Sequence, residues 1–150
     1  MNYKKIVVVC IVSLVLLTGV LSGCGGHNGT LKDGYYTAEM AEYASGWKEF
    51  VTIHVENGII ASVEYNAKNA SGYIKSWDMA YMRRMNAAKG TYPNYYTRAY
   101  ARQVVEKQSA EGIETVAGAS LSGGKFRLMV EAAIESAKNG KTEVAIVQES

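Results

Sequence analysis

The fold is decided by residues 47–66, WKEFVTIHVENGIIASVEYN. Val51, Ile53 and Val55 alternate with polar residues, the period of two expected for a strand with one buried face. Asn57-Gly58 is typical of a type I′ turn, which needs positive φ at both of its central positions. Residues 47–56 and 59–66 are therefore predicted to pair as an antiparallel β-hairpin.

The rest of the chain predicts one strand before this hairpin, and helices after it. Residues 35–43 are expected as a strand with Tyr36, Ala38 and Met40 on one face. Helices are expected at residues 77–88, with Ser76 as N-cap, at 94–109 and at 124–138, and a closing strand at 142–147. Strands followed by helices favour an α+β fold in a single domain: an antiparallel curved sheet with helices packed on one side.

The first 23 residues are predicted to be a signal peptide, not part of the fold. Two lysines precede the apolar run Ile6–Val20, which is short for a membrane-spanning helix. The run ends in Leu21-Ser22-Gly23-Cys24, a sequence that fits the bacterial lipobox, whose cysteine receives diacylglycerol before cleavage. Lipid on Cys24 would give stable membrane anchoring. An uncleaved anchor is the alternative.

The predicted organisation is therefore a signal peptide at residues 1–23, a flexible lipid tether at 24–30 and one domain at 31–150. Lys and Arg number 16 against 14 Asp and Glu, and loss of the two leader lysines balances the charge. With no basic run, a nucleic-acid partner is not expected. Cys10 leaves with the leader and Cys24 carries lipid, so no thiol remains for a disulfide or a zinc site. His27 and His54 alone do not indicate a metal site.

A second segment, Glu114-Thr115-Val116-Ala117-Gly118-Ala119-Ser120-Leu121-Ser122, is expected to carry the function. Small residues precede the hydroxyl of Ser120, and an amphipathic helix is predicted to follow. Free N–H groups and the positive end of the helix dipole favour a phosphate at such a point. Gly118 and Ala119 let a bulky group approach the backbone. Alternatively, Ser120 or Ser122 is simply the helix N-cap.

The segment resembles the flavinylation motif of the FMN-binding domain family, Asp-x-x-Ser-Gly-Ala-Thr followed by a hydroxyl-rich run. In that family the last Thr, or a Ser, is joined through its oxygen to the phosphate of FMN. A flavin transferase makes this bond, with FAD as donor and Mg²⁺ as its own cofactor. The matching position here is Ser120, while Glu114 and Ala117 replace the Asp and the Ser. Lys-Asp-Gly-Tyr-Tyr at 32–36, Trp47 and Val-Glu-Asn-Gly at 55–58 extend the resemblance over nearly the whole chain beyond the leader.

The resemblance implies a lipid-anchored flavoprotein on the extracytoplasmic face of the cell membrane. Its FMN would be held by Ser120 with Gly118, Ala119, Glu114 and Ser122 around it. Implied partners are a flavin transferase and a membrane NADH or quinol dehydrogenase, and implied kin are the flavin-bearing subunits of Na⁺-pumping NADH:quinone reductase and Rnf complexes. An electron carrier is expected more than a stand-alone enzyme, because no Ser-His-Asp set, P-loop or Rossmann glycine pattern is present. A flavin-dependent reductase and a flavin-free surface antigen or binding lipoprotein are the alternatives.

Overall fold

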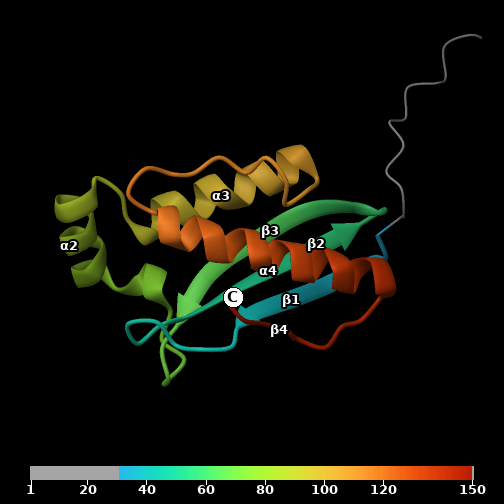
Figure 1. The fold of residues 1–150 in the computed structure, drawn as a ribbon, viewed down its shortest axis with the longest axis horizontal. Helices are drawn as coiled ribbons and strands as arrows, with labels where there is room; N and C mark the ends of the chain where they lie inside the picture. The colour runs from blue at the N-terminus through green and yellow to red at the C-terminus, as the bar shows by residue number, and fades with distance from the viewer. Residues whose placement is uncertain (1–30, 150) are drawn as a thin grey trace, which may run out of the picture.

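Two helices lie across one face of a four-stranded sheet (Figure 1). The computed structural model describes residues 31–149. Its elements in chain order are the strands β1 (Gly34–Met40), β2 (Lys48–Glu56) and β3 (Ile59–Lys68), the 3-10 helix η1 (Lys75–Trp77), the helices α2 (Met79–Lys89), α3 (Pro93–Lys107) and α4 (Ser120–Asn139), and the strand β4 (Ala145–Val147). The predicted α+β class is confirmed. The predicted leader, tether and lipidated Cys24 lie outside the described residues.

The sheet has the order β3-β2-β1-β4, so the predicted hairpin forms its centre. β2 pairs antiparallel with both β1 and β3. The turn between β2 and β3 has φ of 54° at Asn57 and 76° at Gly58, as a type I′ turn requires. β4 adds to β1 in the parallel direction, so the sheet is mixed at that edge, where an antiparallel sheet was predicted.

The core lies between the sheet and the helices α3 and α4. The predicted inward residues of β1 and β2 are all buried, and α3 packs on β3 while α4 packs on β1 and β2. The side chains that α4 contributes are fully enclosed at helical spacing: Phe126, Met129, Val130, Ala133 and Ala137. This apolar stripe fixes α4 along the sheet.

The helix predicted at residues 77–88 begins later than expected. Its N-cap is Asp78, whose carboxylate accepts a hydrogen bond from the Tyr81 N–H at 2.8 Å. Ser76 lies in η1 instead, where its hydroxyl accepts a hydrogen bond from the Asn66 amide at 2.9 Å. Trp77 is therefore outside the helix and 64% exposed. The prediction of Ser76 as N-cap is wrong because a partner on β3 binds its hydroxyl.

The helix predicted at residues 124–138 begins four residues earlier, at Ser120. The pair Gly123-Gly124 resembles a helix break in the sequence, but Gly123 lies against the Tyr100 ring, where any Cβ would collide with the phenol. Glycine is required at 123 by packing, not by a turn. Within residues 31–149, no helix has both the length and the apolar character needed to cross a membrane.

Gly58→Val is expected to destabilise the domain by about 1–3 kcal/mol, because a β-branched residue is strained at positive φ. The measurement is urea unfolding. Gly124→Ala is the matched control: position 124 is helical and has open space around its Cβ, so alanine there should stabilise by up to about 1 kcal/mol. Equal unfolding free energies for Gly58→Val and the wild type would contradict the turn assignment.

Candidate functional site

The start of α4 has no capping side chain. Its N-cap residue is Ala119, and neither Ser120 nor Ser122 occupies the cap, so the N-cap alternative is wrong. The first turn carries no acidic residue. Ser120 is exposed, and within residues 31–149 its hydroxyl makes no hydrogen bond. The free N–H groups of the first turn and the unused hydroxyl of Ser120 therefore lie at the same end of α4.

A tight turn brings the chain into α4. The Ala119 N–H donates to the Val116 carbonyl at 3.0 Å, and Gly118 between them has φ of 77°. A Cβ at Gly118 would lie 2.5 Å from the Lys89 carbonyl oxygen and 3.0 Å from Thr91 Cγ2. Only glycine fits this close approach. Thr91 lies in the connection between α2 and α3, and its Oγ1 is buried and has no hydrogen-bond partner within the described part of the chain.

Side chains of α3 hold this loop in place. The Tyr100 hydroxyl accepts from the Val116 N–H at 3.0 Å and donates to the Ala119 carbonyl at 3.1 Å. Gln103 accepts from the Glu114 N–H at 2.7 Å and donates to the Glu114 carbonyl at 3.2 Å. Lys107 donates to the Gly112 carbonyl. The sequence analysis did not assign these roles, although Tyr100, Gln103 and Lys107 share one helical face by their spacing.

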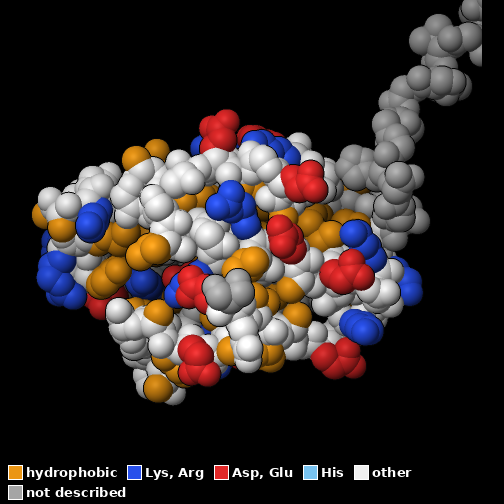
Figure 2. Space-filling view, viewed as in Figure 1, with side chains coloured by type: hydrophobic (Ala, Val, Ile, Leu, Met, Phe, Trp, Pro, Cys, Tyr) orange, Lys and Arg blue, Asp and Glu red, His pale blue; other side chains and the backbone are white. Residues whose placement is uncertain are grey.

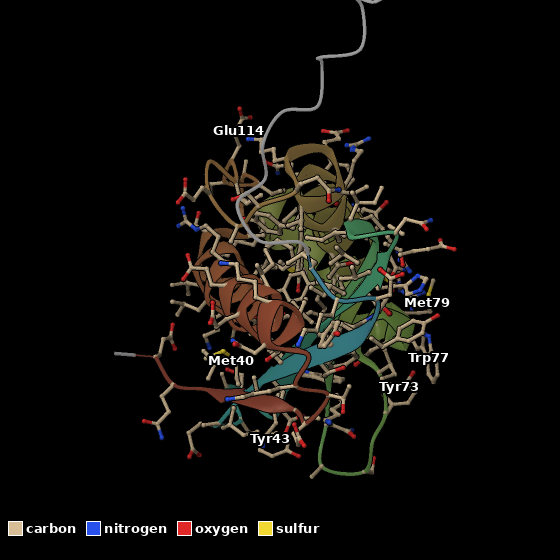
Figure 3. The ribbon with its side chains drawn as sticks, turned by 90° about the vertical axis from the view of Figure 1, so that its right-hand side faces the viewer. Met40, Tyr43, Tyr73, Trp77, Met79 and Glu114 are labelled. Carbon is tan, nitrogen blue, oxygen red and sulfur yellow. The ribbon has the colours of Figure 1, made fainter. Side chains whose placement is uncertain are left out.

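The structure brings most of the predicted site residues together. Gly118, Ala119 and Ser120 form the turn and the first position of α4, and Ser122 is half-buried on the inner side of the first turn. Glu114 is different: its backbone is fixed to Gln103, but its side chain is exposed and lies at the outer edge of the molecule (Figure 3). Within residues 31–149 the Glu114 carboxylate has no ion-pair partner.

A buried polar group lies beneath the first turn of α4, and we call Glu49, Tyr65, Tyr96 and Ser122 the Glu49 cluster. The Tyr65 hydroxyl lies 2.9 Å from Glu49 Oε2 and 3.1 Å from the Ser122 carbonyl oxygen. The Ser122 hydroxyl donates to Glu49 Oε1 at 3.5 Å. β2, β3 and the start of α4 are therefore joined through one carboxylate.

Burial dominates the proton affinities of this cluster. It raises the pKa of Glu49 above the ordinary 4.5, although the Tyr65 hydrogen bond and the charges of Lys75 and Lys125 oppose the rise. Burial, followed by the nearby Glu49 charge, also raises the pKa of both Tyr65 and Tyr96. Both phenols therefore keep their protons at neutral pH and remain hydrogen-bond donors.

Metal-ligating residues do not gather in the part of the chain that the structure describes: no three His, Cys, Asp or Glu side chains lie close enough to hold an ion. His54, on the sheet face away from the helices, stacks on Tyr35 with ring centroids 4.3 Å apart. Acidic and basic side chains are interspersed over the face shown in Figure 2. The start of α4 thus combines three groups: backbone N–H groups that can bind an anion, the hydroxyl of Ser120, and the protonated tyrosine side chains of the Glu49 cluster below them.

Comparison with known proteins places the chain among lipoproteins. No family model matches it. It is 32% identical over 133 residues to the 15 kDa lipoprotein of Treponema pallidum (strain Nichols), covering 89% of this chain and 92% of that protein. The chain belongs to the family of this lipoprotein. Membership in the 15 kDa lipoprotein family agrees with the lipoprotein predicted from Leu21–Cys24.

One solved structure shares the fold of this 15 kDa lipoprotein family member. The crystal structure of the CPE2226 protein of Clostridium perfringens is 33% identical, with a TM-score of 0.76, and the match covers 80% of this chain and 99% of that one. A solution NMR structure of a Clostridium thermocellum protein is 30% identical, with a TM-score of 0.49 over 71% of this chain and 92% of that one.

Tyr100→Phe is expected to destabilise the domain by about 1–3 kcal/mol, because it leaves the Val116 N–H without its acceptor and removes one of the two donors to the Ala119 carbonyl, the other being the Gly123 N–H. The change in the free energy of unfolding is measured by denaturant unfolding. The matched control is Tyr95→Phe, which removes a hydroxyl from an exposed ring and should change stability by less than about 0.5 kcal/mol. Equal effects of the two substitutions would contradict the role assigned to the Tyr100 hydroxyl.

The raised pKa of Glu49 predicts a pH-dependent stability. Because the folded state binds the proton more tightly, the contribution of Glu49 is fully present below its unfolded-state pKa of about 4.5 and is lost as pH rises through the folded-state pKa. Glu49→Gln removes this titration. The unfolding free energy of the wild type minus that of Glu49→Gln should therefore fall between pH 4 and pH 8, measured by urea unfolding. A difference that is flat or rises with pH would refute the assignment.

Proposed function

We propose that this lipoprotein carries FMN as a phosphoester on Ser120 and relays electrons on the extracytoplasmic face of the membrane. The donor would be a membrane NADH or quinol dehydrogenase, as the resemblance to the FMN-binding domain family implies. One observation carries the proposal: an exposed, unbonded Ser120 hydroxyl at the first position of the 20-residue helix α4, behind an N-cap without a side chain.

The residues at this point fit the phosphodiester that would join Ser120 to the flavin. The N–H groups of the first turn and the helix dipole favour an anion, and no acidic residue in that turn opposes it. At Gly118 the turn before α4 packs closely against the Lys89 carbonyl. Because this position must be glycine, it adds no side chain next to Ser120. The exposure of Ser120 gives a transferase access to it. The hydrogen bonds of Tyr100 and Gln103 to the loop before α4 hold Ser120 in one position before the flavin is attached.

Attachment would be a transfer to the Ser120 oxygen. The pyrophosphate bond of FAD breaks, the Ser120 Oγ–phosphorus bond forms, AMP leaves and the hydroxyl proton passes to solvent. The bound flavin supplies the electron-carrying chemistry, and the protein sets its position and electrostatic surroundings. A covalent bond also keeps the cofactor on an extracytoplasmic protein, where a dissociated flavin would be lost by dilution. The site can then remain open to a redox partner.

The position of Ser120 in the fold suits exchange with partners away from the lipid. Lys32, at the start of the described chain, donates its N–H to the Ala137 carbonyl at the C-terminal end of α4. α4 has 20 residues and is therefore about 30 Å long, with Ser120 at its other end. Figure 1 shows α4 running along the long axis of the domain. The proposed flavin would lie at the end of the domain opposite to the point where the anchor joins.

Ser120→Ala is expected to abolish covalent flavin on the mature protein after co-expression with a flavin transferase, because it removes the acceptor oxygen. Intact mass and in-gel fluorescence measure the attached flavin. Ser120→Thr should retain it, since the hydroxyl remains, and Ser122→Ala should retain most of it. Flavin located at another residue by peptide mass spectrometry, or a wild-type mass without one FMN minus water, would refute attachment at Ser120.

A flavin-free binding lipoprotein is the second candidate, and one surface feature favours it. Tyr73, Trp77 and Met79 are 43%, 64% and 59% exposed and lie along one side of the molecule (Figure 3). The Tyr73 and Trp77 rings are 6.2 Å apart, and the Tyr73 hydroxyl donates to the Trp77 backbone carbonyl, which orients the Tyr73 ring. Clustered exposed aromatic residues are typical of interaction sites. If the protein isolated from its own cells carries no flavin, binding of a partner is the better supported of the two functions.

A further inference from the structure

The helix α2 contributes little to the core and carries unpaired charge. Met82 is its only buried side chain, and the helix packs mainly on η1. It has no acidic residue, and its cations Arg83, Arg84 and Lys89 are all exposed. Within residues 31–149 none of the three makes an ion pair. Packing of an apolar face stabilises most short helices, whereas α2 presents most of its surface to solvent.

Exposed apolar side chains lie next to these cations. Trp77 precedes α2, Met79 is its first residue, and the Tyr73 ring meets the Trp77 ring edge-on. Figure 2 shows basic and hydrophobic side chains together at the end of the molecule where Figure 1 places α2. Tryptophan, tyrosine, methionine and arginine are the side chains enriched at protein–protein interfaces. We call this set the α2 surface: Tyr73, Trp77, Met79, Arg83, Arg84 and Lys89.

The C-terminal end of α2 lies against the turn that leads into Ser120. A Cβ at Gly118 would be 2.5 Å from the Lys89 carbonyl oxygen and 3.2 Å from Lys89 Cβ. The opposite end of α4 is where the Lys32 N–H bonds to the Ala137 carbonyl, on the side of the predicted anchor. The 20 residues of α4 separate these ends by about 30 Å. This position favours a protein partner over the membrane as the occupant of the α2 surface.

We propose that the α2 surface docks an acidic patch of the protein that takes electrons from the flavin, an inference that rests on FMN being carried by Ser120. Three unpaired cations complement acidic side chains, and the exposed rings give the contact an apolar centre. A partner held there lies beside the turn before Ser120, which brings its redox group close to the flavin. Charges of this kind act mainly on the rate of encounter, and salt screens them.

The test is the rate at which the reduced, flavinylated protein is oxidised by cytochrome b5, an acidic haem protein, measured by stopped-flow absorbance. Each reduced flavin gives one electron to each of two oxidised haems, and its protons pass to solvent. The double variant Arg83→Glu, Arg84→Glu should lower the second-order rate constant at least about tenfold at low ionic strength. The difference should shrink in high salt. Oxidation by cytochrome c, a basic haem protein, should not become slower in this variant.

Two further variants separate local contact from net charge. Lys138→Glu, Lys141→Glu makes the same change of charge near the other end of α4 and should leave the rate with cytochrome b5 unchanged. Trp77→Ala should lower that rate, because the contact loses its exposed ring. All of these side chains except that of Lys138, which pairs with Glu135, are without an ion-pair partner within residues 31–149.

The outcomes separate the two proposals. A wild-type protein that acquires no flavin refutes the proposed function, and this partner with it. Full flavin content with an unchanged cytochrome b5 rate in Arg83→Glu, Arg84→Glu refutes only the docking surface, and equal losses in the two double variants refute it as well.

Two other occupants would also overturn the proposal. Lipidated protein in vesicles whose tryptophan fluorescence is quenched by brominated phosphatidylglycerol, with the quenching lost in Trp77→Phe, would assign the α2 surface to the membrane. A dimer that dissociates in Trp77→Ala would assign it to a second copy of the chain.

Discussion

The structure depends on a contact between three aromatic rings from three elements. The Tyr65 ring of β3 lies 4.7 Å from Phe126 of α4, and the Tyr100 ring of α3 lies 5.4 Å from Phe126. All three side chains are almost fully buried. Their apolar faces join the sheet to both helices, and such contacts stabilise a core beyond the area they remove from water. Gly123 makes this packing possible because any side chain there would occupy the position of the Tyr100 phenol.

The same rings connect the core to the candidate site. Tyrosine has a polar end, and a buried hydroxyl must find a partner. The Tyr100 hydroxyl bonds to Val116 and Ala119 in the turn before α4, while that of Tyr65 bonds to Glu49 and Ser122. The position of Ser120 is thus set by core packing, not by loop residues alone. A site whose supporting side chains are locked by core packing is rigid.

Buried ionisable groups lie near the start of α4. Glu49 is buried there with a raised pKa and two phenols keep their protons, while Lys75, which is buried too and makes no ion pair within residues 31–149, opposes the rise in the Glu49 pKa. Buried charges are expensive, and a fold that needed only stability would use apolar side chains in these positions. They lie near the start of α4, whereas the Lys32–Ala137 contact lies at its C-terminal end.

The sequence by itself determined the parts that depend on local patterns. Alternation in β2 and the Asn57-Gly58 turn predicted the hairpin, and an amphipathic helix was predicted at 124–138, within α4, because period and turn chemistry are local properties. Tertiary structure decided the rest. Ser76 is bonded to Asn66 from another strand, Ala119 and not a serine occupies the α4 N-cap, and β4 joins its sheet in parallel. Tyr100 and Gln103 acquire their roles from partners in the turn before α4. A pattern along the chain shows which residues are present but not which of them come into contact in the fold.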